Sequence, residues 1–325
     1  MRILLLGGNG FGKVHARSYR NLGIQFSVFS RNHDVLKEYK NDYGVLNTFS
    51  DIDEAINSEY DAVDIVLPHN LHLKYAREAM KRGRHVLIEK PIASTVEEAR
   101  DMISLAGENK VKFMVAEQYF FDSALKEIEK LLSHNAIGKV HTIIIRDQRL
   151  YTKKGWRAEQ NAMGGGSLID GGIHYIEAML DLGGPVSKMN SSVYHGGSSL
   201  EGEDNALAMF TFENGAHGFF YYSWAYPYAP RLPAYEIIGT EGSIVEDLET
   251  KPRVDFKYQD VPRHAFGLPV VNGEVLEGRI KDVFDEEISG FLNSIENKTD
   301  VPYQPELALR NLEAIMKIYK STQQD

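Results

Sequence analysis

Two polar side chains in a glycine-rich stretch have the spacing of a proton-transfer pair. Asp170 and His174 are four residues apart within residues 164–174. If this stretch is helical, both side chains lie on one face of the helix. Imidazole titrates near neutral pH, so His174 could accept or donate a proton beside Asp170. The alternative is a helix-capping aspartate next to an ordinary surface histidine, and the spacing alone leaves both open.

A glycine-rich segment near the start of the chain could hold a dinucleotide. Residues 7–12 read Gly-Gly-Asn-Gly-Phe-Gly and lie between an apolar run and a helical pattern. Small residues let the backbone approach phosphates, and the amino end of a helix favours negative charge. If Gly7 and Gly12 are the outer glycines of the fingerprint, its middle position is Asn9, which tolerates left-handed dihedrals. The alternative is a tight turn without a ligand. The residues expected to contact the cofactor here are Gly7, Asn9, Gly10, Phe11 and Gly12.

The residues about twenty positions further on bear on the choice between NAD and NADP. An NAD site usually has a carboxylate there that accepts from the ribose 2′-hydroxyl. This sequence has Ser30 and Arg31 instead, and a hydroxyl with a guanidinium suits a 2′-phosphate. We therefore expect NADP to be preferred over NAD, although Asp34 could still reach the ribose and Arg31 could be a solvated surface residue.

The first third of the chain has the pattern of a parallel sheet covered on both faces. Apolar runs without polar alternation are separated by helical patterns, which is typical of a doubly wound α/β domain. The runs are residues 3–6, 26–29, 62–67, 85–88 and 112–116, and the helical patterns are residues 12–21, 35–43, 71–82 and 95–109. Lys90 follows one of these strands, at the end where such sheets bind ligands, although a lysine at a strand end is also a common surface feature.

The pattern changes after residue 120. Alternating segments predict an open, mostly antiparallel sheet with one covered face. These segments are residues 140–149, 206–212, 218–224 and 235–238, with helices at 123–133, 283–297 and 305–319 and loops at 250–278. The predicted fold is thus α/β, with a Rossmann dinucleotide-binding domain at 1–120 and an α+β substrate-binding and oligomerisation domain at 121–325.

Composition excludes several classes of function. The 325 residues carry a net charge of −10, which argues against nucleic-acid binding and against anionic membranes. Cysteine is absent, so disulfides, thiolate catalysis and Cys-ligated metals are excluded. No apolar stretch is long enough for a signal peptide or a membrane span, and we expect a cytoplasmic protein.

Taken in order, the motifs of this chain resemble those of the Gfo/Idh/MocA oxidoreductases, the family of glucose–fructose oxidoreductase and inositol dehydrogenase. The central motif is His85 to Pro91, which contains Glu89-Lys90-Pro91. The others are the glycine loop with His15 after it, Leu67-Pro68-His69-Asn70 with His72, Trp156-Arg157, residues 164–174, Glu203-Asp204, Asn214-Gly215 and residues 239–242. The resemblance covers nearly the whole chain.

The resemblance implies roles for several residues. It implies a cis Lys90–Pro91 peptide, with Lys90 hydrogen-bonded to the reacting oxygen, where a cation stabilises developing charge. It also implies that His174 is the general acid or base and that Asp170 aids positioning or proton relay. We place Leu67, Pro68, His69, His72, Glu89 and Lys90 against the cofactor, and Tyr119, Tyr151, Trp156 and Arg157 against the substrate.

Two further groups carry less weight. His69 and His72 have no carboxylate or third ligand placed by the sequence, so we expect no metal. Arg146, Arg149, Lys153, Lys154 and Arg157 form a basic cluster. It could meet an anionic substrate, but a solvated strand-and-loop face explains it more simply.

The sequence therefore predicts an NAD(P)-dependent oxidoreductase that interconverts a secondary alcohol and a ketone of a sugar, polyol or cyclitol. One alternative is a non-catalytic nucleotide-binding regulatory protein on the same scaffold. Another is a redox-assisted glycosidase. The aromatic run at residues 219–228 and the open sheet predict a homo-oligomer, either a dimer or a tetramer.

Overall fold

The chain folds into two compact units. The computed structural model describes residues 1–152, 154–253 and 262–322. One unit contains Met1–Gln118 and Phe284–Leu309, and the other contains Tyr119–Val283 and the residues from Arg310 onward. The sequence analysis placed every residue after 120 in the second domain, whereas Phe284–Leu309 packs with the first unit. The domain limits at residue 120 stay a prediction.

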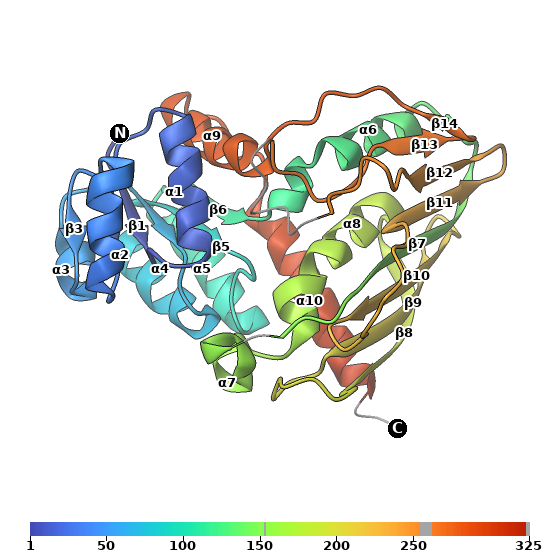
Figure 1. Cartoon of the computed structure of the whole chain (residues 1–325), viewed down its shortest axis with the longest axis horizontal. Coiled ribbons are helices and arrows are strands. Elements are labelled where there is room, and N and C mark those ends of the chain that lie inside the picture. Colours follow the sequence, from blue (N-terminus) through green and yellow to red (C-terminus); the bar gives the residue numbers. More distant parts are fainter. Residues whose placement is uncertain (153, 254–261, 323–325) are drawn as a thin grey trace. The chain divides into compact units, whose positions relative to one another are not determined.

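Within the described residues, the first unit contains a six-stranded sheet in the order β3-β2-β1-β4-β5-β6 (Figure 1). Every pairing in it is parallel. All residues of β1, β4 and β6 are buried, as expected for strands covered on both faces. The strands are β1 Ile3–Leu6, β2 Phe26–Phe29, β3 Thr48–Phe49, β4 Ala62–Ile65, β5 His85–Glu89 and β6 Phe113–Ala116. The predicted doubly wound sheet is confirmed.

Three helices of this unit begin at a side-chain cap. Asn32, Asp51 and Thr95 each accept a hydrogen bond from an amide in the first turn of the helix that follows. The helices are α1 Phe11–Asn21, α2 His33–Glu38, α3 Ile52–Asn57, α4 His72–Lys81, α5 Val96–Glu108 and α9 Val283–Glu296. The sequence analysis missed β3 and α3 because elements of two and six residues are too short to show a period.

The second unit is built on a larger sheet. In the part of the chain that the structure describes, its order is β14-β13-β12-β11-β7-β10-β9-β8, and only β7 and β10 pair in parallel. The predicted mostly antiparallel sheet is confirmed. The strands are β7 Val140–Gln148, β8 Val186–Tyr194, β9 Asn205–Phe212, β10 His217–Ser223, β11 Tyr235–Gly239, β12 Ser243–Glu246, β13 Pro269–Val271 and β14 Glu274–Val275. The expectation of loops throughout 250–278 is wrong at β13 and β14, which were too short to show alternation.

Helices cover one face of this sheet. Helix α8 packs on β7 and β10, and Ser191 of β8 hydrogen-bonds to the backbone of Ile318 in α10 (Figure 1). The opposite face exposes Met209 by 62% and Phe219 by 42%, while their neighbours along each strand are buried. The helices are α6 Ser123–Ser133, α7 Gln160–Met163, α8 Ile173–Gly183 and α10 Pro305–Thr322. Across the described ranges, no helix is long and apolar enough to cross a membrane.

Candidate active site

Two glycines of the glycine loop lie so close to backbone carbonyl groups that no side chain would fit. A Cβ atom on Gly12 would lie 1.7 Å from the carbonyl oxygen of Gly7, and one on Gly7 would lie 2.1 Å from that of Val66. Gly10 has a φ of +56°, and a Cβ there would meet no described atom within 4 Å. No described side chain caps the amino end of α1. Open space beside an uncapped helix start fits a dinucleotide pyrophosphate.

The carboxyl end of β2 presents an exposed guanidinium. Arg31 is exposed, whereas Ser30 is buried and its Oγ accepts the backbone N–H of Asn32 at 3.2 Å. The Asp34 carboxylate pairs with Lys37 Nζ at 3.1 Å in the first turns of α2. Arg31 is therefore the group at this strand end that suits a 2′-phosphate.

His72 connects the segment after β4 to the segment after β5, which contains Lys90. His72 is fully buried, with Nδ1 3.0 Å from the carbonyl oxygen of Pro91 and Nε2 3.1 Å from that of Leu67. Burial lowers the pKa of His72. His72 thus braces this segment through backbone contacts. Among the described residues, no three His, Asp or Glu side chains gather as metal ligands.

Lys90 directly follows β5 and is only 5% exposed. Its backbone N–H donates to Oε2 of Glu89 at 3.2 Å. The Lys90–Pro91 peptide is cis, as the resemblance implied. Lys90 thus lies at the carboxyl end of β5, and parallel sheets of this kind bind ligands at the carboxyl ends of their strands.

The second unit brings Asp170 and His174 to the start of one helix. Leu168–Gly172 forms a π-helical turn that leads into α8, so Asp170 lies in the π-helical turn and His174 in the α-helix. Gly171 permits this turn to approach the sheet, because a Cβ there would lie 2.0 Å from the hydroxyl of Tyr222. Asp170 is 3% exposed and His174 is 6% exposed.

Three of the predicted substrate residues surround this pair. The ring of Tyr119 stacks on that of His174 with centroids 4.4 Å apart. Arg157 Nε lies 3.3 Å from Oδ2 of Asp170. The Cζ atom of the same guanidinium lies over the Trp156 ring, 4.3 Å from the ring centroid. The chain therefore gathers an imidazole, a carboxylate and a guanidinium among aromatic rings. Tyr151 contacts Trp224 instead, at 5.2 Å between ring centroids.

The buried carboxylate of Glu203 hydrogen-bonds to the backbone of this π-helical turn. Glu203 Oε1 accepts the backbone N–H of Leu168 at 2.8 Å and the hydroxyl of Tyr319 at 3.1 Å. Burial raises the pKa of Glu203 to about 7. The sequence analysis named Glu203 only as part of a motif, because its partner in α10 is distant in sequence.

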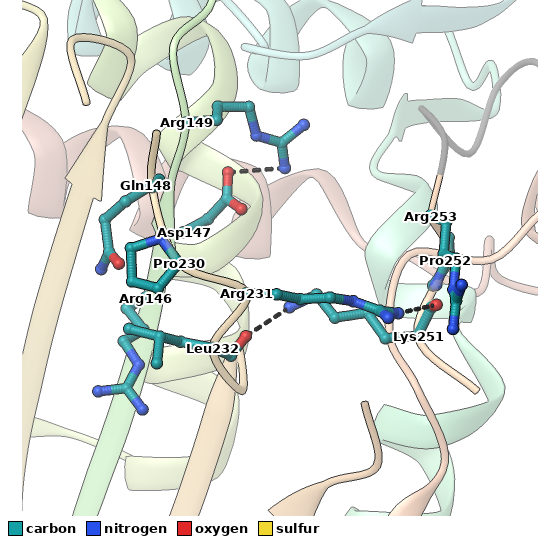
Figure 2. Close-up of a pocket in the computed structure, with 11 residues that line it drawn as sticks. Arg146, Asp147, Gln148, Arg149, Pro230, Arg231, Leu232, Lys251, Pro252 and Arg253 are labelled. Carbon is teal, nitrogen blue, oxygen red and sulfur yellow. Dashed lines mark hydrogen bonds and ion pairs between the residues drawn. The ribbon is translucent and has the colours of Figure 1, made fainter. Parts of the chain in front are cut away.

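The basic cluster does not form a single site. Arg146 and Arg149 line a cavity of about 640 Å³ together with Arg231, Lys251 and Arg253 (Figure 2). Carboxylates balance most of this charge. The ion pairs are Arg149–Asp147 at 2.7 Å, Lys251–Glu246 at 2.8 Å, Arg253–Glu249 at 3.6 Å and Arg146–Glu236. Arg157 and Lys154 do not line this cavity, and Lys153 lies outside the described residues. This distribution agrees with a solvated strand-and-loop face.

Both halves of the sequence match one family. Residues 1–117 match the oxidoreductase family described as having an NAD-binding Rossmann fold, and residues 125–245 match the GFO/IDH/MocA C-terminal domain. The scyllo-inositol 2-dehydrogenase (NADP(+)) IolU of Bacillus subtilis is 31% identical over 244 residues, which cover 72% of each chain. The chain belongs to the Gfo/Idh/MocA oxidoreductase family. The predicted family and the predicted NAD(P)-dependent dehydrogenase are thus confirmed, and the two alternatives are not favoured.

Other members of the Gfo/Idh/MocA family share its sequence or its fold. The levoglucosan dehydrogenase of Pseudarthrobacter phenanthrenivorans is 26% identical over 307 residues, covering 82% of this chain and 79% of that protein. The crystal structure of an oxidoreductase from Thermotoga maritima superposes with a TM-score of 0.86 at 23% identity, covering 99% of this chain and 96% of that one. A levoglucosan dehydrogenase in complex with NADH and levoglucosan has a TM-score of 0.83 at 23% identity, covering 100% and 97%. These structural likenesses support the fold.

Proposed function

We propose that this dehydrogenase transfers hydride between a nicotinamide and a secondary alcohol or ketone of a sugar, polyol or cyclitol. The observation that carries the proposal is the stack of Tyr119 on His174 beside Asp170, with ring centroids 4.4 Å apart. An imidazole held against an aromatic wall suits a proton acceptor next to a sugar ring. The names of the inositol and levoglucosan dehydrogenases that resemble this chain support the same substrate class.

Two residues are assigned to the hydroxyl group of the substrate, one to its proton and one to the charge on its oxygen. When an alcohol is oxidised, its carbon loses hydride and its hydroxyl loses a proton. The bound nicotinamide supplies the hydride acceptor. We assign the proton to His174, and the developing negative charge on the oxygen to the ammonium group of Lys90. We assign Asp170 a positioning or proton-relay role, and Arg157 Nε lies 3.3 Å from its Oδ2.

The cofactor is held by the first unit. We propose that the glycine loop, at Gly7, Asn9, Gly10, Phe11 and Gly12, receives the pyrophosphate. Ser30 and Arg31 would receive the ribose, with NADP preferred over NAD because Arg31 offers an exposed guanidinium. The residues proposed to contact the nicotinamide half are Leu67, Pro68, His69, His72, Glu89 and Lys90.

Assembly is a separate proposal. The exposed face of the eight-stranded sheet carries Met209 and Phe219, which lie opposite each other in the pairing of β9 with β10. We expect a dimer or tetramer to cover this face, since large apolar side chains grouped on a sheet favour association. The cytoplasmic location expected from the sequence also stays a prediction.

The function is tested by a substrate screen. Sugars, polyols and cyclitols are offered to the purified protein with NADP⁺ and with NAD⁺, and the absorbance of the reduced nicotinamide is followed. We expect turnover of at least one compound of this class. If both cofactors bind but no compound is turned over in either direction, the substrate class proposed here is wrong. Glycoside cleavage without accumulation of reduced cofactor would point to the redox-assisted glycosidase.

A further inference from the structure

One histidine in the first unit is bonded to two buried carboxylates next to Lys90. His15, on α1, is fully buried. Its Nδ1 lies 2.8 Å from Oδ2 of Asp64, and its Nε2 lies 3.1 Å from Oε1 of Glu89. Asp64 belongs to β4 and Glu89 ends β5, which is the neighbouring strand. A single imidazole therefore ties helix α1 to two parallel strands.

With both carboxylates ionised, this geometry requires a positively charged ring. An ionised carboxylate only accepts hydrogen bonds, so both ring nitrogens of His15 must carry hydrogen to satisfy both partners. Burial by itself lowers the pKa of His15, but Asp64 and Glu89 outweigh burial and raise it well above its ordinary value. The hydrogen bonds at both nitrogens are then charge-assisted, which makes them stronger than neutral ones.

Near the ring lie a tyrosine and two further acidic side chains. The hydroxyl of Tyr19 donates to Oδ2 of Asp64 at 2.9 Å. Glu117 is 1% exposed, and Glu287 of α9 is fully buried. Burial raises the pKa of Glu287 well above its ordinary value. His15 opposes this rise, and Glu89, Glu117 and Asp64 add to it. Glu287 is thus favoured in its neutral form.

The cluster reaches the proposed catalytic lysine through Glu89. One oxygen of Glu89 faces His15, and the other accepts the backbone N–H of Lys90 at 3.2 Å. We propose that His15 is a positioning residue for Lys90: as an imidazolium it fixes the Glu89 carboxylate, which in turn fixes the backbone from which Lys90 projects. His15 also lies on the helix that begins at the glycine loop. The cluster thereby connects the cofactor-binding helix with the strand end that carries the lysine.

This inference rests on the proposed role of Lys90, so its test needs measurements that do not depend on turnover. The first is the ¹⁵N NMR spectrum of the histidine side chains in the full-length parent protein, with His15 assigned from His15→Gln. We expect both nitrogens of His15 to be protonated at pH 8, well above the ordinary imidazole pKa of about 6.5. A neutral ring at pH 8 would overturn the proposal.

The second measurement is amide hydrogen exchange at Lys90. In His15→Gln, the Lys90 amide should exchange roughly tenfold faster or more, because a neutral amide replaces a charged donor to Glu89. The amide of Leu87, in the interior of β5, should keep its rate. Tyr19→Phe is the matched control, since it removes a hydrogen bond to Asp64 without touching Glu89, and it should leave the Lys90 amide unchanged. Equal acceleration at Leu87 and Lys90 would mean that His15 only stabilises the fold.

The third measurement separates kcat from cofactor affinity. His15→Gln should lower kcat roughly tenfold with the Kd for NADPH changed less than about twofold, and Tyr19→Phe should retain parental kcat.

If His15→Gln does not fold, Glu89→Gln serves instead. That variant keeps the side-chain shape but removes one anion, so the ring of His15 should become neutral at lower pH than in the parent. An unchanged His15 titration in Glu89→Gln would overturn the proposal. If Lys90→Ala retains full activity while the NMR and exchange results hold, the proposed role of Lys90 fails and the cluster itself stands.

Discussion

The rings of Tyr119 and His174 are nearly parallel, with an interplanar angle of 19° and centroids 4.4 Å apart. Tyr119 is itself held edge-on by Tyr175 at 5.4 Å and by Phe266 at 5.1 Å. A packed aromatic group therefore lies against the plane of the imidazole.

This stack predicts that the ring of Tyr119, not its hydroxyl, orients His174. Tyr119→Phe should keep kcat within about threefold, whereas Tyr119→Leu should lower it by tenfold or more, because a misplaced base loses much of its effect. Steady-state kinetics of both variants decide the matter. Equal losses in the two variants would instead assign the effect to the hydroxyl.

His174 and Lys90 should share one kinetic signature. His174→Ala removes the proton acceptor and should lower kcat about a hundredfold or more. Lys90→Ala should have a comparable effect, and Asp170→Asn an intermediate one, since it leaves the base in place. Cofactor affinity should stay close to the parental value in each variant, and circular dichroism should show a folded chain. A variant of either His174 or Lys90 with parental turnover would remove that residue from the mechanism.

Arg31 should set the cofactor preference. Fluorescence titration is expected to show tighter binding of NADPH than of NADH, and Arg31→Asp should reverse the order. Loss of a charge-assisted contact to a phosphate corresponds to roughly tenfold or more in Kd for NADPH. Lys40→Asp, the same charge change at an exposed residue, is the control and should leave the ratio unchanged. Equal parental affinities for the two cofactors would contradict the assignment.

Glu203 should make stability depend on pH. Burial raises its pKa to about 7, above its value of about 4.3 in an unfolded chain. The stability that protonated Glu203 contributes is fully present below pH 4.3 and is lost as the pH rises through about 7. Glu203→Gln should therefore gain up to about 2 kcal/mol relative to the parent between pH 5 and pH 8. Denaturant unfolding at both values measures this gain, and the exposed Glu201→Gln should show none.

The exposed sheet face should mediate assembly. Sedimentation of the parent at micromolar concentration should show a species larger than the 36.7 kDa monomer. Phe219→Lys should dissociate it, because a lysine on this face must be desolvated on association. Tyr228→Lys changes a fully exposed residue outside the strands and should not dissociate it. A monomeric parent would refute the oligomer.

The sequence by itself determined the parallel-sheet pattern of the first unit, apart from β3 and α3, and the family to which its motifs belong. Continuous apolar runs such as residues 3–6 mark buried parallel strands whatever their neighbours. The glycine loop directly follows that run, and Lys90 directly follows β5. The alternating segments of the second unit identified its sheet in the same way. These features are local, so they can be read without knowing which elements meet.

Only the tertiary structure decided which distant residues meet. His15 lies 49 residues from Asp64 and 74 from Glu89, and Glu203 lies 116 from Tyr319. No periodicity links such positions, because these contacts depend on how helices and strands pack. The π-helical turn before α8 and the packing of Phe284–Leu309 with the first unit depend on packing in the same way. Sequence therefore identified the chemical groups, and packing determined which of them are charged, buried and held in place.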